Sequence, residues 1–144
     1  MKEPSVSESV EQQCLFRWAQ FASGQHPELN LLYHIPNGGA RSKATAGRLK
    51  AEGVKAGVPD ICLPVARGGY HGLYIELKKE HGGTASQKQK EWLFVLSEQG
   101  YQAVICHGWE EAKQEILEYL KGEKDNERNR SVPILRSGCR YRLS

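Results

Sequence analysis

Two acids and a lysine in the middle of the sequence have side chains of complementary chemistry. Glu76 and Lys78 are two residues apart in an apolar segment, and Asp60 follows a proline upstream of them. Because side chains alternate along a strand, Glu76 and Lys78 point to one face while Leu77 points to the other. An acid and an amine on one face, with a second acid within reach, would suit metal-assisted hydrolysis.

A hairpin would bring Asp60 to this strand. The segments 58–65 and 72–78 have the pattern of strands, and Gly68 with its neighbours supplies the glycines that a tight reversal requires. If the hairpin is centred on Gly68, residues whose numbers sum to about 136 face one another, which pairs Asp60 with Glu76. We therefore expect the two carboxylates to be cross-strand neighbours.

Two carboxylates beside apolar side chains are costly unless a cation neutralises them. Carboxylate oxygens, waters and a main-chain carbonyl such as that of Leu77 suit Mg²⁺ or Mn²⁺, whereas zinc would normally recruit Cys or His ligands. Beside such an ion Lys78 would orient or deprotonate an attacking water, which implies phosphodiester hydrolysis. The alternative is an ordinary acidic hairpin, with Asp60 capping a turn and Glu76 paired with Lys78 on a solvent face.

The net charge of +3 is weak support for a nucleic-acid partner, because the C-terminal residues account for it. Residues 121–144 hold seven Lys or Arg against three Asp or Glu. The informative charge is local, between residues 40 and 55, and suits either DNA phosphates or a solvated helix face. The cationic residues of this stretch are Arg41, Lys43, Arg48, Lys50 and Lys55.

The elements that must position these residues follow from periodicity and turn signals. The order α-β-α-β-β-α-β-α predicts an α/β domain with a central mixed sheet flanked by helices, over residues 1–120, followed by a basic, flexible tail over 121–144. The N-terminus lacks a secretory signal, so we expect a cytoplasmic protein. The expected helices cover 6–23, 43–52, 84–100 and 109–120, and the expected strands 31–35, 58–65, 72–78 and 101–106.

The motif residues resemble a known family. Gly57-Val58-Pro59-Asp60-Ile61 followed by Glu76-Leu77-Lys78 is similar to the VRR-NUC branch of the PD-(D/E)xK nuclease superfamily. The turn Ile35-Pro36-Asn37-Gly38-Gly39 and the run from Gly53 to Gly57 support the resemblance. It implies a restriction-endonuclease-like core and a Mg²⁺- or Mn²⁺-dependent, structure-specific DNA endonuclease. Phages carry such domains alone, with activity similar to that of Holliday-junction resolvases.

The resemblance also implies a Glu on the first helix at the metal, and two residues compete for this role. At about 100° per residue, Glu11 lies near the middle of the apolar face, whereas Glu8 lies at its edge, which suits a site open to substrate. The spacing from Glu8 to Trp18 also resembles the family pattern. We therefore expect Glu8, Asp60, Glu76 and the Leu77 carbonyl as metal ligands, with Glu11 as the alternative to Glu8.

Further residues are expected to position the catalytic strands or to contact DNA. Gln89 faces inward with Trp92 and Leu93, and the resemblance gives it a positioning role beside the catalytic strands; an ordinary hydrogen-bonded boundary role is the alternative. His34 is either a DNA contact or a structural histidine, and the turn at Asn37 would expose backbone donors to DNA. The expected DNA contacts are His34, Asn37, Arg41, Lys43, Arg48 and Lys55.

The leading hypothesis is an endonuclease that cuts branched or flapped DNA, with a two-fold homodimer supplying the paired cuts that a four-way junction requires. One alternative is a sequence-specific restriction-type nuclease. Another is a DNA-binding module without catalysis, although phosphate binding alone gains nothing from buried negative charge.

Overall fold

The computed structural model describes residues 6–36 and 42–122. Their order confirms the expected alternation of helices and strands, with one added 3₁₀ helix. The elements are α1 (Glu8–Ala22), η1 (Pro27–Leu31), β1 (Tyr33–His34), α2 (Lys43–Ala51), β2 (Ile61–Leu63), β3 (Leu73–Lys78), α3 (Gln87–Glu98), β4 (Gln102–His107) and α4 (Trp109–Lys121).

The four strands form one mixed sheet in the order β1-β2-β3-β4. β2 is antiparallel to both β1 and β3, whereas β3 and β4 are parallel. In the hairpin Ile61 faces Ile75 and Leu63 faces Leu73, which is the register expected from a reversal centred on Gly68. Extended by one residue, this register would place Asp60 opposite Glu76, although the ladder itself begins at Ile61.

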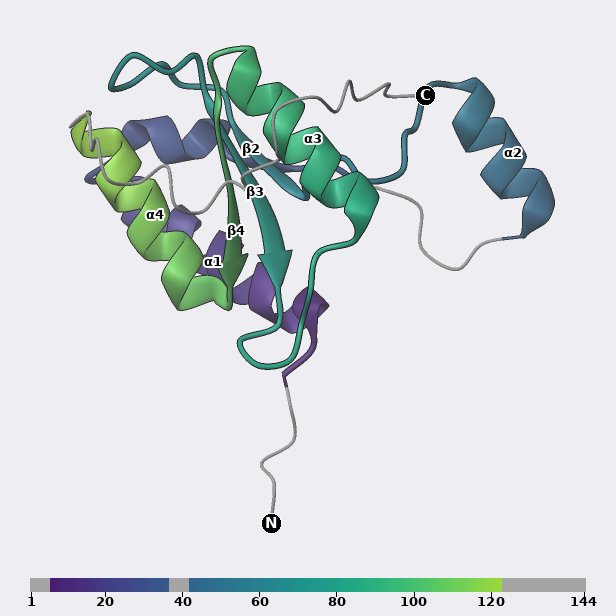
Figure 1. Ribbon diagram of the computed structural model, residues 1–144. Coiled ribbons are helices and arrows are strands. Elements are labelled where there is room, and N and C mark those ends of the chain that lie inside the picture. The colour runs from purple at the N-terminus through teal and green to yellow at the C-terminus, as the bar shows by residue number, and fades with distance from the viewer. Residues whose placement is uncertain (1–5, 37–41, 123–144) are drawn as a thin grey trace.

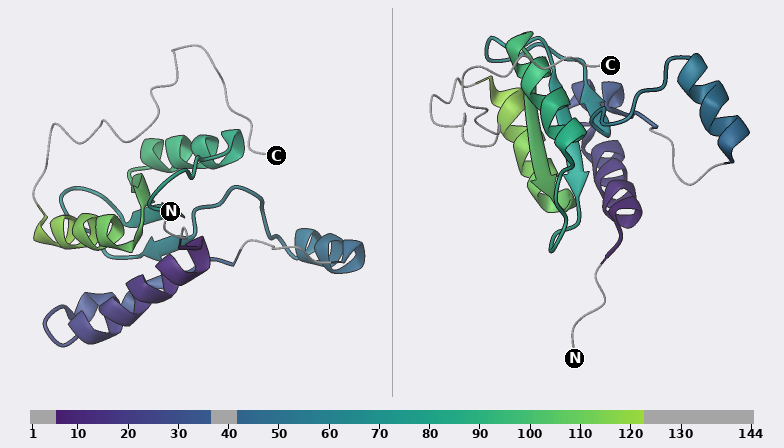
Figure 2. Two further views of the ribbon diagram at one scale, coloured as in Figure 1. Left: turned by 90° about the horizontal axis from the view of Figure 1, so that it is seen from below. Right: turned by 45° about the vertical axis from the view of Figure 1, so that its right-hand side comes forward.

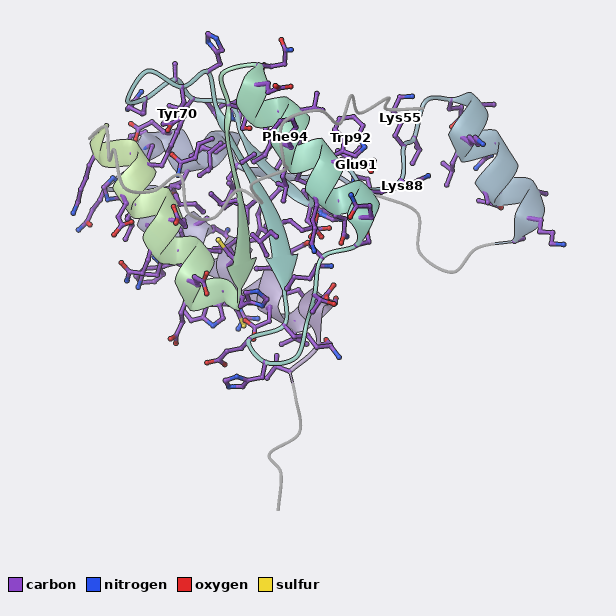
Figure 3. The ribbon with its side chains drawn as sticks, viewed as in Figure 1. Lys55, Tyr70, Lys88, Glu91, Trp92 and Phe94 are labelled. Atoms are coloured by element: carbon purple, nitrogen blue, oxygen red, sulfur yellow. The ribbon has the colours of Figure 1, made fainter. Side chains whose placement is uncertain are left out.

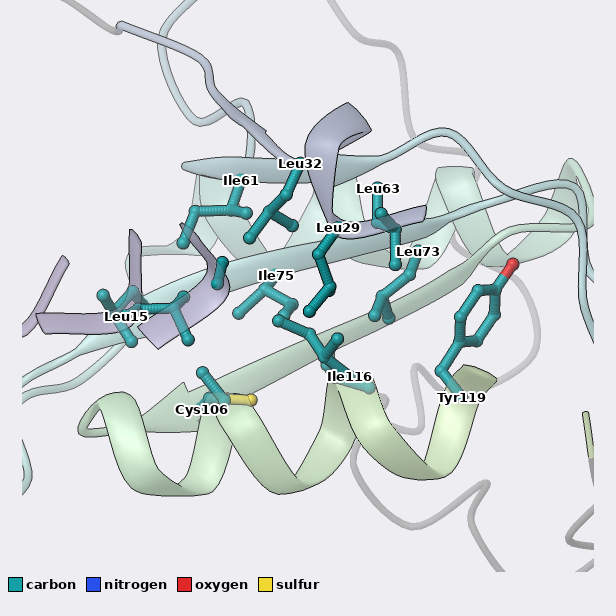
Figure 4. Close-up of a cluster of buried hydrophobic side chains, with 14 of the residues drawn as sticks. Leu15, Leu29, Leu32, Ile61, Leu63, Leu73, Ile75, Cys106, Ile116 and Tyr119 are labelled. Carbon is teal, nitrogen blue, oxygen red and sulfur yellow. The ribbon is translucent and has the colours of Figure 1, made fainter. Parts of the chain in front are cut away.

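Helices cover both faces of the sheet. α1 and α4 pack on one face and α3 on the other, which Figure 2 shows edge-on. The alternation of β3 turns Leu73, Ile75 and Leu77 toward α1 and α4, where they join the main apolar core. Figure 4 shows part of this core between the sheet, η1 and α4. The residues buried there include Leu15, Leu29, Leu32, Ile61, Leu63, Val104, Cys106 and Ile116.

Two expected strands are much shorter than their apolar runs, and the strands expected from residues 72 and 101 each begin one residue later. The strand expected over 31–35 covers only Tyr33–His34, because Pro27 starts a 3₁₀ helix that includes Leu31. A proline suits the first turn of a helix, since it lacks an N–H that would otherwise be unpaired. β2 is confined to Ile61–Leu63 between Pro59 and Pro64, which cannot donate to a strand ladder.

α2 stands clear of the sheet and its covering helices (Figure 1). The side chain of Ser42 caps its N-terminus by accepting a hydrogen bond from Thr45 N. None of its residues is buried against the described part of the chain, and most of them are exposed. Among the described residues, no helix is long and apolar enough to cross a membrane.

The boundary expected between a domain and a tail falls at the end of α4, which closes at Lys121 with Gly122 in the left-handed conformation. Residues 123–144 lie outside the described residues, so the division at 120 and 121 stays a prediction.

Candidate active site

β3 carries Glu76 and Lys78 on the face that α3 covers. Glu76 is 1% exposed and Lys78 is 7% exposed. The Lys78 Nζ lies 3.4 Å from Glu76 Oε1. This burial rules out an ion pair on a solvent face, which was the ordinary alternative for these residues. A charged pair is costly to bury, so its position beneath α3 calls for further partners.

Asp60 reaches β3 from the segment just before β2. Its Oδ2 accepts a hydrogen bond from Leu77 N at 2.9 Å. Its main-chain carbonyl accepts from Ile35 N at 2.7 Å and lies 2.8 Å from His34 Nδ1. The carboxylate is therefore held across the hairpin, on the main chain between Glu76 and Lys78, instead of capping a local turn.

The direction of the Leu77 carbonyl follows from strand geometry. Gly108 N donates to the Lys78 carbonyl at 2.9 Å, so that carbonyl points toward the β4 side. Successive carbonyls of a strand point to opposite edges, which turns the Leu77 carbonyl toward the side of β2 and Asp60. β2 pairing begins only at Ile61, opposite Ile75, so no β2 residue of the ladder lies opposite Leu77.

Gln89 connects α3 to Glu76 through both ends of its amide group. Its Nε2 donates to Glu76 Oε1 at 2.8 Å, and its Oε1 accepts from Ser86 N at 2.8 Å. Ser86 Oγ in turn accepts from Gln89 N at 3.2 Å, which completes a capping box at the start of α3. The amide of Gln89 cannot flip without losing both bonds, so its orientation toward Glu76 is set by the helix cap.

These contacts leave one carboxylate oxygen without a partner. Glu76 Oε1 receives both Gln89 and Lys78, whereas Glu76 Oε2 is buried and has no hydrogen-bond partner among the described residues. Burial, and next the negative charge of Asp60, raise the pKa of Glu76 to about 8, although Lys78 acts to lower it. A buried acceptor beside a second carboxylate fits a cation, because a positive charge would satisfy both at once.

The two candidate acids of α1 have different surroundings. Glu11 is 4% exposed and its Oε2 accepts from Trp109 N at 2.7 Å, at the first residue of α4. Gly108, the N-cap of α4, has no side chain to do this, so Glu11 caps the helix from α1. Glu8 is exposed in the first turn of α1, and no contact among the described residues places it beside Asp60. Throughout residues 6–36 and 42–122, no three Asp, Glu, His or Cys side chains are close enough together to hold a metal ion.

The capping role of Glu11 was missed from the sequence. A glycine directly before an amphipathic helix was the available signal, since such a helix must find an acceptor for its first N–H groups elsewhere.

Of the six expected DNA contacts, four lie in the described part of the chain and two do not. Lys43, Arg48 and Lys55 are exposed on or directly after α2, and His34 is exposed on β1 with its Nδ1 held by the Asp60 carbonyl. Figure 3 labels Lys55 and Lys88 on the side of α3 that faces α2. Asn37 and Arg41 lie outside the described residues.

A mixed sheet with helices on both faces, carrying two acids and a lysine at neighbouring strands, defines the class of restriction-endonuclease-like proteins. A family model described as the VRR-NUC domain matches residues 5–110. The chain therefore belongs to the VRR-NUC domain family, as the motifs suggested. A solved structure described as a VRR_NUC domain protein has a TM-score of 0.72 and 32% sequence identity, and the match covers 84% of this chain and 93% of that chain. A comparison with curated proteins gave no significant match.

Membership in this family gives the chain a nuclease-type function and, with it, a DNA substrate. Nucleases of this family are generally metal-dependent.

Proposed function

We propose that the chain is a Mg²⁺- or Mn²⁺-dependent endonuclease that hydrolyses phosphodiester bonds in branched or flapped DNA. The observation that carries the proposal is the unpartnered, buried Glu76 Oε2. It belongs to a carboxylate that neighbours Asp60 and shares its strand with Lys78.

Asp60, Glu76 and the Leu77 carbonyl would hold the divalent ion, with Glu8 as the ligand from α1. All four donors are oxygens, which suits a hard cation such as Mg²⁺ or Mn²⁺. When bound, such an ion supplies Lewis-acid stabilisation to the phosphoryl group and the leaving oxygen. Glu8 is exposed, so its carboxylate is free to turn toward the site, whereas Glu11 is occupied at the start of α4.

Three side chains prepare the site for the reaction. Gln89 binds one oxygen of Glu76 and leaves the other free. Lys78 is buried with its Nζ beside that carboxylate. There its ammonium form would orient the attacking water, and its neutral amine form would accept a proton from that water. Asp60 is held on Leu77 N through Oδ2, and its carboxylate lies beside that of Glu76. Orientation before the substrate arrives lowers the reorganisation needed in the reaction.

The cationic residues of α2 would bind the phosphates of the substrate. Lys43 and Arg48 are exposed along a helix that stands away from the sheet, and Lys55 follows it on the path to Asp60. His34, Asn37 and Arg41 complete the proposed DNA surface. A branched substrate offers more than one duplex arm, which suits a protein that presents a projecting basic helix as well as a buried site. A homodimer would supply two such sites for paired cuts.

The test is cleavage of labelled duplex, flap and four-way-junction DNA of one sequence, with Mg²⁺, Mn²⁺ or EDTA. We expect metal-dependent cutting of the branched substrates, and a loss of about 100-fold or more in Asp60→Ala and Glu76→Gln with DNA binding retained. Glu98→Gln is the matched control, because this acid is exposed at the end of α3. Cutting by Glu76→Gln at the wild-type rate would remove Glu76 from the site.

The same assay separates the alternatives. Cutting of plain duplex at one fixed sequence would indicate a restriction-type nuclease. Binding of all substrates without any cutting would indicate a DNA-binding module.

A further inference from the structure

Gln89 and Asp60 approach β3 from two separate segments. Gln89 comes from the first turn of α3 and binds Glu76, whereas Asp60 comes from the segment before β2 and binds Leu77 N. The distance between these two segments therefore decides how closely both side chains can fit around Glu76. The 2.8 Å hydrogen bond from Gln89 to Glu76 would be lost if its two atoms separated to about 3.6 Å.

The two segments touch at Gly57. A Cβ on this residue would lie 2.9 Å from Lys88 Cβ and 3.0 Å from both the carbonyl carbon and the oxygen of Lys88. Two of these three atoms belong to the main chain of the first turn of α3, so they cannot rotate away as a flexible side chain can. The segment therefore lies against α3 at a distance that only glycine permits.

Short, stiff stretches of chain connect the contact between Gly57 and Lys88 to the two residues that approach Glu76. Lys88 directly precedes Gln89 in the capping-box turn. Gly57 is three residues before Asp60, and the intervening Pro59 is buried and restricts its own φ. A displacement at the Gly57 contact would thus be transmitted to both Gln89 and Asp60.

We propose that Gly57 is a positioning residue. It allows the segment leading to Asp60 to pack against the first turn of α3, and this packing holds Gln89 within hydrogen-bonding distance of Glu76. The proposal rests on the proposed function for its consequence in catalysis, but the contact itself is independent of that function.

A simpler explanation is that Gly57 is needed only for its backbone conformation, since its φ is +90°. Gly53 provides the matched control for this explanation. Its φ is +101°, yet a Cβ there would meet nothing within 4 Å. Alanine at either position imposes a similar backbone strain, but only alanine at Gly57 presses on Lys88.

The experiment compares Gly57→Ala with Gly53→Ala in the full chain. The first readout is the pair of side-chain amide NMR signals of Gln89 in the metal-free protein, assigned with Gln89→Leu. We expect Gly57→Ala to shift or broaden these signals while Gly53→Ala leaves them in place. The second readout is cleavage of the branched substrate, in which Gly57→Ala should lower kcat at least tenfold with KM within about twofold. Equal behaviour of the two variants in both readouts would overturn the proposal.

A second pair of variants covers the case in which Gly57→Ala does not fold. Lys88→Gly removes the Lys88 Cβ, the atom nearest to where a Cβ on Gly57 would lie, and Gln87→Gly introduces the same flexibility one residue earlier in the turn. The Gln89 signals should change in Lys88→Gly and not in Gln87→Gly, and an equal change in both would overturn the proposal. If the wild type cuts no DNA but these signals respond as expected, the proposed function fails while the positioning role stands.

Discussion

At the scale of single residues, the choice of Gln at position 89 has a physical explanation. The third residue of a helix with a capping box is commonly Glu or Gln, and either can accept from the main chain of the cap. Only Gln also offers a donor, and here that donor binds Glu76. A carboxylate at this place would set a third negative charge against Glu76 and Asp60.

The variant Gln89→Glu tests this explanation. It should keep the capping box, and with it the stability of α3, while lowering cleavage by about tenfold or more, because an acceptor replaces the donor that binds Glu76. Thermal unfolding and kcat are measured together, with Gln87→Glu as the control at an exposed position of the same turn. Full activity in Gln89→Glu would show that the contact with Glu76 does not matter.

The raised pKa of Glu76 predicts how stability changes with pH. Its ordinary pKa of 4.5 is raised to about 8 in the folded protein, so between these values the folded, metal-free protein binds a proton that the unfolded chain has released. The free energy of unfolding should therefore fall as pH rises through this window, by at most about 1.4 kcal/mol per pH unit from this group.

Thermal unfolding in EDTA from pH 5 to 8.5 measures this effect. Glu76→Gln should lack the Glu76 component of the slope and be the more stable protein at pH 8. Adding Mn²⁺ at pH 8 should stabilise the wild type and have less effect on Glu76→Gln. Identical pH slopes in the two proteins would contradict the assignment.

At the scale of elements, α1 and α4 are joined by a cap supplied from one helix to the other. Glu11 of α1 accepts from the first N–H of α4, and Lys113 of α4 lies over the rings of Trp18 and Trp109 at 5.8 and 6.0 Å. Both interactions link the helices that cover the core face of β3. α1 thus has a structural acid at Glu11, and Glu8 is left as its candidate for the metal.

Stability and activity should separate these two acids. Glu11→Ala leaves the partly buried N–H of Trp109 without this acceptor and should cost about 1–3 kcal/mol, whereas Glu8→Ala should change stability by less than about 0.5 kcal/mol. The effect on cleavage should be the opposite: when both variants are folded, Glu8→Ala should lower kcat more than Glu11→Ala. Denaturant unfolding and kcat measure the two effects, and a Glu8→Ala protein with full activity would exclude Glu8 as a ligand.

At the scale of the whole molecule, two parts with opposite electrostatics are joined near Gly57. The sheet holds the buried carboxylate of Glu76 with the partly buried Asp60 beside it, and α2 presents exposed cations at a distance from them. DNA bound by both parts would place its phosphates on α2 and one scissile bond at β3.

This arrangement predicts the salt dependence of binding. Replacing both Lys43 and Arg48 by Ala should weaken binding of every substrate. The slope of log affinity against log salt concentration should become shallower by about 0.9 for each duplex phosphate that α2 no longer neutralises. Lys121→Ala, an exposed cation at the end of α4, is the control. An unchanged slope in the double variant would mean that α2 does not bind the phosphates.

The sequence by itself determined the features that depend on local rules. The pairing of Ile61 with Ile75 and of Leu63 with Leu73 follows from the alternation of strands and a glycine turn, which is why the register about Gly68 was predictable. The expected strand over 31–35 was partly wrong, because a proline and the packing of η1 outweighed an apolar run.

Only the tertiary structure decided the contacts between distant segments. That Glu11 caps α4, that Gln89 binds Glu76 with an orientation set by Ser86, and that Gly57 touches Lys88 depend on how the helices pack against the sheet. Periodicity shows which face of a helix is buried, but not which backbone group it meets, because packing angles arise from side chains of both elements. Periodicity placed Glu11 in the middle of the apolar face of the first helix and Glu8 at its edge. The backbone N–H that Glu11 binds became visible only in the fold.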